Sequence, residues 1–367
     1  MADNRETLER LFESGTIDLD RGALFDEAPL ALPDDLDFGR VRGMMLGLAI
    51  GDALGNTSES LAPHHRRVVC GEVRDYLPNP FAGGARVGLP SDDTQLAFWT
   101  LEQMLADGAL VPGNLARRFA SGRIYGIGQT VSGFLSAHRA GRPWFDCGPR
   151  SAGNGALMRI APLVIPHLKT ASADLWVDTA LAAMMTHNDR ASTAACIAFV
   201  AILHELLAMP ATPPPGWWLE AYVTVARDLE GESAYAPRSG DFPDYRGPVW
   251  RFVEREVAGA FDRDMPTVAA CESWGSGAYL LETVPSVLYI LMRHANDAEE
   301  AIVRAVNDTR DNDTAGAIVG AAIGALHGAD RLPSRWRDGL AGRTAEDDDG
   351  RVHELLDEAE ETFWRRG

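Results

Sequence analysis

Two glycine patterns constrain the fold of this chain more than any other feature of its sequence. Each lies in an apolar segment, 40–55 or 314–328, and spaces its glycines four residues apart. The glycines are Gly43, Gly47 and Gly51 in the first segment, and Gly316, Gly320, Gly324 and Gly328 in the second. Residues four apart share one face of a helix, where glycine lowers helix propensity. The pattern therefore predicts two buried helices, each with another backbone packed closely against its glycine face.

Helical spacing of apolar residues recurs along the rest of the chain. It predicts further helices over 94–107, 173–186, 190–208, 249–262, 277–294, 297–307 and 345–365. The segment 210–248 is rich in Pro, Gly and aromatic residues and is interpreted as a long irregular insertion. No alternating run predicts a strand, and no repeat with a period of about 20–50 residues is visible. The predicted fold is all-α, a compact multi-helix bundle.

The first part of the chain differs from the rest. Residues 1–38 are acidic and end in ALPDDLDFG, a Pro- and Asp-rich stretch typical of a linker. The predicted organisation is an N-terminal extension, 1–38, followed by one domain, 39–367. A length of 367 residues is within reach of a single large domain.

Charge and cysteine usage limit the partners that we expect. The net charge is −19, from 34 basic and 53 acidic residues, and such a surface repels nucleic-acid phosphates. The four cysteines show no short pair spacing, so neither a disulfide framework nor a zinc knuckle is predicted. The N-terminus has no apolar signal core, and the segment 44–50, taken as the longest apolar stretch, is too short to span a bilayer. We expect a cytoplasmic protein with neither nucleic-acid nor membrane partners.

Two acidic clusters, SDDT at 91–94 and DNDT at 311–314, each precede a predicted helix. One interpretation is ordinary helix capping, because Asp and Thr are common N-cap residues. A cap needs one side-chain oxygen, however, and each cluster offers three or four. Asp311 and Asp313 would point the same way on an extended loop and share an ion. Together the clusters favour a site for hard divalent cations, and Glu59 can lie beside it.

Two further segments carry weaker signals. The loop SAGNG, 151–155, has small residues whose N–H groups can approach a phosphate or a ribose, although a plain turn into a helix is the alternative. His187 follows an apolar helix, where it can contact a ligand or bond a helix carbonyl. These patterns indicate a hydrolase of a phosphate-bearing substrate. They do not separate phosphoester from glycosidic cleavage.

These segments, in this order, resemble the ADP-ribosylglycohydrolase family, which includes the dinitrogenase-reductase-activating glycohydrolases. The resemblance spans about residues 40–335 and rests on GMMLGLAIGDALGNTSE, SDDTQ, SAGNGALMR, THNDRA and DNDTAGAIVGAAIGALHG. It implies an all-α fold, a centre of two Mg²⁺ or Mn²⁺ ions, and removal of ADP-ribose from modified protein side chains. We favour the arginine N-linkage, and serine O-linkage is the alternative.

The resemblance also implies roles for individual residues. The implied metal ligands are Ser91, Asp92, Asp93, Asp311, Asp313 and Thr314. The implied catalytic residues are Glu59, Asp92 and Asp311, with Glu59 orienting or activating the nucleophile. The implied substrate-binding residues are Glu59, Ser151, Gly153, Asn154, Gly155 and His187.

The chain departs from the family pattern in two places. Ser91 stands where relatives often have Thr, which keeps the hydroxyl. Thr309 and Arg310 replace two glycines, so Arg310 either clamps a phosphate or carboxylate, or narrows the cleft. Residues 1–38 are similar to the extensions of bacterial immunity proteins of this family, which makes an ADP-ribosyltransferase toxin a second candidate partner. A dinuclear phosphohydrolase is a further alternative.

Overall fold

The computed structural model describes residues 3–365, and over this range it is all-α, with isolated β-bridges but no strand. The predicted multi-helix fold is confirmed. Its α-helices are α1 Asn4–Glu13, α2 Phe38–Gly55, α3 Pro63–Cys70, α4 Asp92–Asp107, α5 Pro112–Ser121, α6 Gln129–Arg139, α7 Asp174–Met184, α8 Arg190–Ala208, α9 Pro215–Glu230, α10 Val249–Asp262, α11 Thr267–Trp274, α12 Leu280–His294, α13 Ala298–Asp308, α14 Asn312–His327, α15 Ser334–Gly339 and α16 Arg351–Ala359. A π-helical turn, Glu360–Arg365, follows α16.

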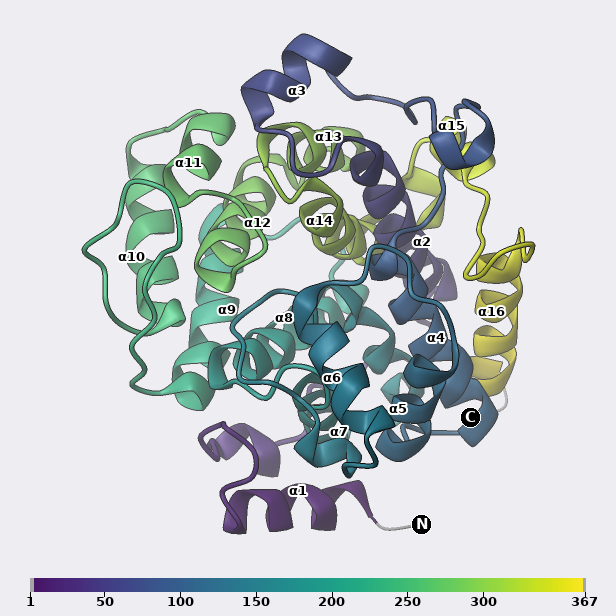
Figure 1. Ribbon diagram of the computed structural model, residues 1–367, viewed down its shortest axis with the longest axis vertical. Coiled ribbons are helices and arrows are strands. Elements are labelled where there is room, and N and C mark those ends of the chain that lie inside the picture. Colours follow the sequence, from purple (N-terminus) through teal and green to yellow (C-terminus); the bar gives the residue numbers. More distant parts are fainter. Residues whose placement is uncertain (1–2, 366–367) are drawn as a thin grey trace.

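The two glycine-patterned segments form α2 and α14, which pack directly against each other near the centre of the molecule (Figure 1). A Cβ atom built on Gly47 would lie 2.0 Å from the carbonyl oxygen of Gly320, and one built on Gly51 would lie 1.9 Å from that of Gly316. These approaches leave no room for a side chain. The backbone expected against each glycine face is therefore that of the other helix.

This helix pair is antiparallel. The glycine early in α2, Gly43, faces Gly324 late in α14, whereas Gly55 at the end of α2 faces Asp313 at the start of α14. The C-terminal end of α2 therefore meets the N-terminal end of α14, where the second acidic cluster lies. The spacing of the glycines thus sets the position of that cluster relative to α2.

The helical predictions agree with the structure at most segments, but two boundaries need correction. The predicted irregular insertion 210–248 is wrong over its first half, because α9 occupies Pro215–Glu230 and packs against α8 and α10, whereas residues 231–248 are irregular as predicted. The prolines of α9 stand at the helix start, where the missing N–H is harmless, and Trp218, Tyr222 and Leu229 are buried. The predicted helix 345–365 begins only at Arg351.

Residues 3–37 pack on the rest of the chain. Helix α1 lies beside α7 at the lower edge of the view (Figure 1), and Asn4 donates hydrogen bonds to Asp178 and to the carbonyl of Leu110. Leu8, Leu11 and Phe25 of this segment are buried in the common core. These contacts tie the N-terminal segment to the body of the molecule.

Helix α8 is, within residues 3–365, the one helix long and apolar enough to meet the criteria for a membrane span. Its apolar run 194–203 is longer than 44–50, the stretch expected to be the longest. Of its most apolar window, 89% is buried inside the structure. This burial is that of a central core helix packed between α7, α9 and α14.

Candidate active site

One pocket collects the sequence-predicted site residues from five separate parts of the chain. All of the predicted residues except Ser91 line it. The lining residues are Glu59, Asp92, Asp93, Gly126, Gly128, Gln129, Thr130, Val131, Ser151, Gly153, Asn154, Gly155, Met158, His187, Arg238, Ala278, Asp311, Asp313 and Thr314. Carboxylates and glycine-rich loops therefore share one hollow.

Both acidic clusters lie at helix N-termini, as the capping interpretation also required. Ser91 is the N-cap of α4, and its hydroxyl accepts a hydrogen bond from the N–H of Asp93. Asp311 precedes the first turn of α14, which contains Asp313. The extended loop expected for Asp311 and Asp313 is therefore wrong. The free N–H groups and dipoles of two helix ends, rather than strand geometry, help to stabilise the gathered carboxylates.

Asp52 is the acidic residue that sequence reasoning missed. It is fully buried in α2 and accepts hydrogen bonds from Ser91 Oγ at 2.7 Å, from Thr94 Oγ1 at 2.5 Å, and from the N–H groups of both residues. It thereby attaches the start of α4 to α2. The Ser91 hydroxyl lies between Asp52 and the pocket carboxylate Asp93, whose Oδ2 is 3.1 Å from Ser91 Oγ. The available signal was an aspartate inside an otherwise apolar helix, where an isolated charge is costly.

The carboxylates form two overlapping groups. One oxygen each from Asp52, Asp93 and Asp313 lie within 4.8 Å of one another, and the same holds for Glu59, Asp311 and Asp313. Asp313 belongs to both. Within residues 3–365, no arginine or lysine forms an ion pair with any of these carboxylates. Their negative charges therefore face one another without an ion-pair partner in this part of the chain, and the buried Arg66 guanidinium acts on Asp313 only from a longer distance.

The electrostatics reflect this crowding. Burial, followed by the charge of nearby carboxylates, raises the pKa of Asp93 and of Asp313 well above the usual value. Asp93 Oδ1 is buried and has no hydrogen-bond partner in the described part of the chain. A buried carboxylate oxygen without a partner is costly, and an all-oxygen donor set is what Mg²⁺ and Mn²⁺ bind. The residues present therefore fit divalent cations.

Asn154 connects the SAGNG loop to the acidic cluster. Its Nδ2 donates to Asp311 Oδ2 at 2.6 Å and to Thr283 Oγ1 at 3.0 Å. The loop is attached to the start of α12, where Leu280 N–H donates to the carbonyl of Ala152. The side chain of Asn154 thus holds Asp311, which leaves the backbone of Gly153 and Gly155 at the pocket surface.

His187 lies beneath this loop. A Cβ built on Gly155 would lie 3.0 Å from its imidazole Cε1, so the loop packs directly on the ring. Burial, followed by the charge of Arg159, lowers the pKa of His187 to about 3. The side chain reaches the pocket as a neutral imidazole.

The structure also adds residues from two further segments to the pocket. Gly126 and Gly128, with Gln129 and Thr130 at the start of α6, come from the glycine-rich stretch GIGQT, whose sequence is a signal of low specificity. Arg238 comes from the loop after α9, and its guanidinium lies 4.1 Å from the ring centroid of Tyr279. Arg310, expected to clamp or narrow the cleft, is exposed and is not among the lining residues.

Comparison with known proteins identifies the family to which this chain is similar. A family model described as ADP-ribosylglycohydrolase matches residues 33–365. The chain is 26% identical to the ADP-ribosyl-[dinitrogen reductase] glycohydrolase of Rhodospirillum rubrum, over 81% of this chain and 88% of that one. It is 28% identical to the ADP-ribosylarginine hydrolase Tri1 of Pseudomonas putida strain GB-1, over 82% and 74%.

A solved structure supports the same assignment. The chain is similar to an ADP-ribosylglycohydrolase-related protein complex, with a TM-score of 0.64 and 27% identity over 89% of this chain and 97% of that one. The family model and the structural match each cover most of this chain. The chain therefore belongs to the ADP-ribosylglycohydrolase family and is a hydrolase that acts on glycosidic bonds to ADP-ribose.

Proposed function

We propose that this chain removes ADP-ribose from arginine side chains of modified proteins, with two Mg²⁺ or Mn²⁺ ions at the carboxylate groups. The arginine linkage is supported by the name of the Pseudomonas putida relative, an ADP-ribosylarginine hydrolase. The Rhodospirillum rubrum relative is named for a modified protein, dinitrogen reductase. The two matches cover 81% and 82% of this chain.

The observation that carries the metal proposal is the pair of overlapping carboxylate groups, which have no ion-pair partner among the described residues. Asp52, Asp93 and Asp313 would hold one ion. Glu59, Asp311 and Asp313 would surround the other. The unpartnered Asp93 Oδ1 needs a cation or a proton. Thr314 and Asp92 line the pocket beside these groups and can complete the oxygen donors.

When bound, the ions would supply positive charge next to the ribose and increase the acidity of a water molecule there. The remaining roles belong to the chain. The Glu59 side chain lines the pocket and is partly exposed to solvent. Its partial burial and the charges of Asp311 and Asp52 raise its pKa, which suits a group that accepts a proton from the attacking water. Asn154 holds Asp311 in place. Cleavage passes through an oxocarbenium-like transition state, as in other glycosidases.

The glycine-rich loops are proposed to bind the nucleotide part of the substrate. The backbone of Gly153 and Gly155 on one side, and of Gly126 and Gly128 on the other, can approach phosphate and ribose oxygens closely. Arg238 is, among the described residues, the one arginine that lines the pocket. Its cation is placed to pair with the diphosphate.

The test is to incubate the purified full chain with arginine- and serine-ADP-ribosylated proteins, with Mg²⁺ or with EDTA. We expect intact ADP-ribose to be released from the arginine-linked substrate in Mg²⁺ only. Asp311→Asn should abolish release, whereas Asp330→Asn, at a fully exposed side chain, should not. Activity in EDTA would end the metal proposal. Release from serine alone would end the arginine assignment, and release of phosphate would indicate a phosphohydrolase.

The alternative is an immunity role in which residues 1–38 bind and block an ADP-ribosylating toxin. The contacts of this segment favour that role less. Asn188 bonds the carbonyl of Thr16 and the N–H of Asp18, and Arg190 pairs with Asp18. The segment is thus bound to its own domain. Inhibition of an ADP-ribosyltransferase by the inactive Asp311→Asn variant would support the immunity role, since hydrolysis cannot contribute there.

A further inference from the structure

A line of buried polar contacts leads from the core to the pocket through His187. Arg159, in the 3₁₀ turn Leu157–Arg159, is fully buried, and its Nη2 donates to the carbonyl of Ala182 at 2.9 Å and to Thr186 Oγ1 at 2.8 Å. Thr186 Oγ1 in turn lies 3.0 Å from His187 Nδ1. A guanidinium can only donate, so the direction of this line is fixed at its buried end.

The position of each proton follows from that direction. Because Thr186 Oγ1 accepts from Arg159, its own hydrogen is free, and His187 Nδ1 is the acceptor within reach. An imidazole that accepts at Nδ1 and is neutral carries its hydrogen on Nε2. The opposite tautomer would leave the Thr186 hydroxyl hydrogen buried without an acceptor, an arrangement that folded proteins avoid.

The guanidinium of Arg159, at the buried end of this line, has few other hydrogen-bond partners. Arg159 Nε and Nη1 are buried without hydrogen-bond acceptors among the described residues, and the guanidinium faces the Phe119 ring at 5.1 Å. Its burial is therefore not explained by a complete set of hydrogen bonds. Its contact with Thr186 is the one side-chain hydrogen bond that it makes there.

The other nitrogen of His187 faces the pocket. No hydrogen bond joins Nε2 to a protein group in residues 3–365. A Cβ on Gly155 would lie 3.2 Å from Nε2 and one on Gly153 would lie 3.6 Å away, so only glycines approach it from the loop. A ligand oxygen can therefore reach this N–H past the backbone.

We propose that Arg159 and Thr186 are positioning residues that hold His187 as the neutral Nε2–H tautomer, so that Nε2–H donates to an acceptor oxygen of bound ADP-ribose. The ligand contact rests on the proposed function, whereas the tautomer rests on the buried contacts alone. The tautomer matters because the opposite form would present a lone pair at the same position, which repels phosphate oxygens and can only accept from a hydroxyl group.

The tautomer can be measured without any substrate. Full-length protein with ¹⁵N-labelled histidine side chains would be examined by NMR, and the His187 signals identified by their loss in His187→Gln. We expect a protonated-type Nε2 and an unprotonated Nδ1. Protonation of Nδ1 in the wild type would overturn the proposal outright, even if every variant below failed to fold.

Variants of Thr186 test the line itself, with ADP-ribose as the calorimetric probe. Thr186→Val removes the hydroxyl, and we expect a mixed tautomer signal and about tenfold weaker binding, the loss of one neutral hydrogen bond. Thr186→Ser should restore both. Thr179→Val is the matched control, since Thr179 is an equally buried α7 threonine whose hydroxyl bonds only the Leu175 carbonyl. It should change neither reading.

The outcomes separate the two claims. Unchanged tautomer and unchanged affinity in Thr186→Val would overturn the positioning role. If wild-type protein shows the Nε2–H tautomer but does not bind ADP-ribose, the proposed function fails while the assignment of the proton stands.

Discussion

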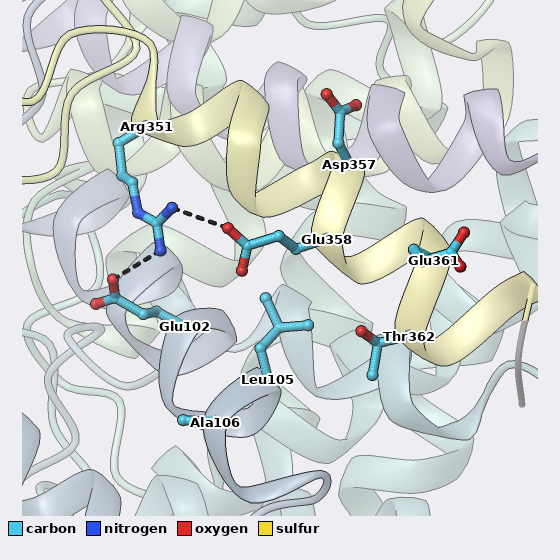
Figure 2. A pocket seen from close by; sticks show the side chains of 8 residues that line it. All are labelled: Glu102, Leu105, Ala106, Arg351, Asp357, Glu358, Glu361 and Thr362. Carbon is cyan, nitrogen blue, oxygen red and sulfur yellow. Dashed lines mark hydrogen bonds and ion pairs between the residues drawn. The ribbon is translucent and has the colours of Figure 1, made fainter.

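The two ends of α4 contribute to two acidic hollows that differ in their chemistry. Its first turn places Asp92 and Asp93 in the pocket, where Asp93 and Asp313 are buried and no carboxylate forms an ion pair within residues 3–365. Further along, Glu102 lies in a groove against α16 and the π-helical turn, with Asp357, Glu358 and Glu361 nearby (Figure 2).

In the groove, arginines neutralise the acids. Arg351 pairs with Glu102 at 3.1 Å and with Glu358 at 3.0 Å, as the dashed lines in Figure 2 show. Arg118 pairs with Glu102 as well, and Arg42 pairs with Asp357. A count of acidic residues would rate the two hollows alike. Arg238 lines the pocket but forms no ion pair with its carboxylates within residues 3–365. Burial together with the absence of arginine ion pairs, rather than acidity, distinguishes a candidate cation site from a solvated surface.

The largest expected difference between the hollows is in catalysis. Asp93→Asn keeps the shape of the side chain but removes one negative charge from the proposed ligands of an ion. We therefore expect kcat/KM to fall by at least about 100-fold. Glu102→Gln, on the same helix, should leave kcat/KM within about twofold. The measurement is ADP-ribose release from an arginine-modified protein. Equal effects of the two variants would contradict a cation site that is confined to the pocket.

Cation binding should separate the hollows in stability as well. Mg²⁺ or Mn²⁺ at about 100 times its Kd should stabilise the folded chain by about 2.7 kcal/mol for each ion bound, because the ions bind only the folded site. Urea unfolding with and without the metal measures this gain. Asp313→Asn, which belongs to both carboxylate groups, should lose most of it, whereas Glu358→Gln should keep it. A gain that persists in Asp313→Asn would place the binding elsewhere.

Glu230, outside both hollows, shows how burial shifts the pKa of a carboxylate that accepts several hydrogen bonds. Glu230 is fully buried and accepts from the N–H groups of Val249 and Trp250 at the start of α10 and from the Ser233 hydroxyl. Burial still raises its pKa to about 7. Because the folded pKa exceeds the unfolded one, its contribution to stability is complete below about pH 4.5 and falls as pH rises through 7.

Glu230→Gln, which cannot ionise, should remove this decline. Between pH 5 and 8 we expect wild-type stability to fall by roughly 2 kcal/mol more than that of the variant. Urea unfolding of both proteins at the two pH values, in EDTA so that the pocket carboxylates behave alike in each, gives the difference. Parallel pH profiles would contradict it.

The smallest effect is expected in the groove. Glu358→Gln removes one partner of a largely exposed ion pair, and we expect a change in unfolding free energy of no more than about 0.5 kcal/mol. Adding 0.5 M NaCl should reduce the difference further, because salt screens exposed charges. A loss of several kcal/mol would show that the groove is a structural or binding site in its own right.

Local sequence patterns predicted the helices well where the signal was local. The apolar spacing placed α8 at 190–208 and α10 at 249–262, and the clusters beginning at Ser91 and Asp311 correctly marked the starts of α4 and α14. The prediction failed for α9, where prolines that open a helix were interpreted as those of a loop. Composition averaged over a window cannot distinguish the two positions.

The sequence was less informative about which residues share the pocket. Asp52 was missed because its one sequence signal, an aspartate in an apolar stretch, does not name a partner, and Arg238 has no such signal. The role of both residues follows from their neighbours in space. Arg310 was misjudged for the converse reason. It stands next to Asp311 in the chain, yet its side chain is exposed and outside the pocket lining.

By itself the sequence determined that this chain is helical, that two of its helices have bare glycine faces, and which segments carry oxygen donors. These properties depend on residues a few positions apart, where helical spacing and capping act. Only the tertiary structure decided that the two glycine faces meet each other antiparallel, and thereby that Asp52, Asp93 and Asp313 lie within 4.8 Å of one another. The physical reason is that close packing of backbones more than 250 residues apart, which no local pattern encodes, brings those charges together.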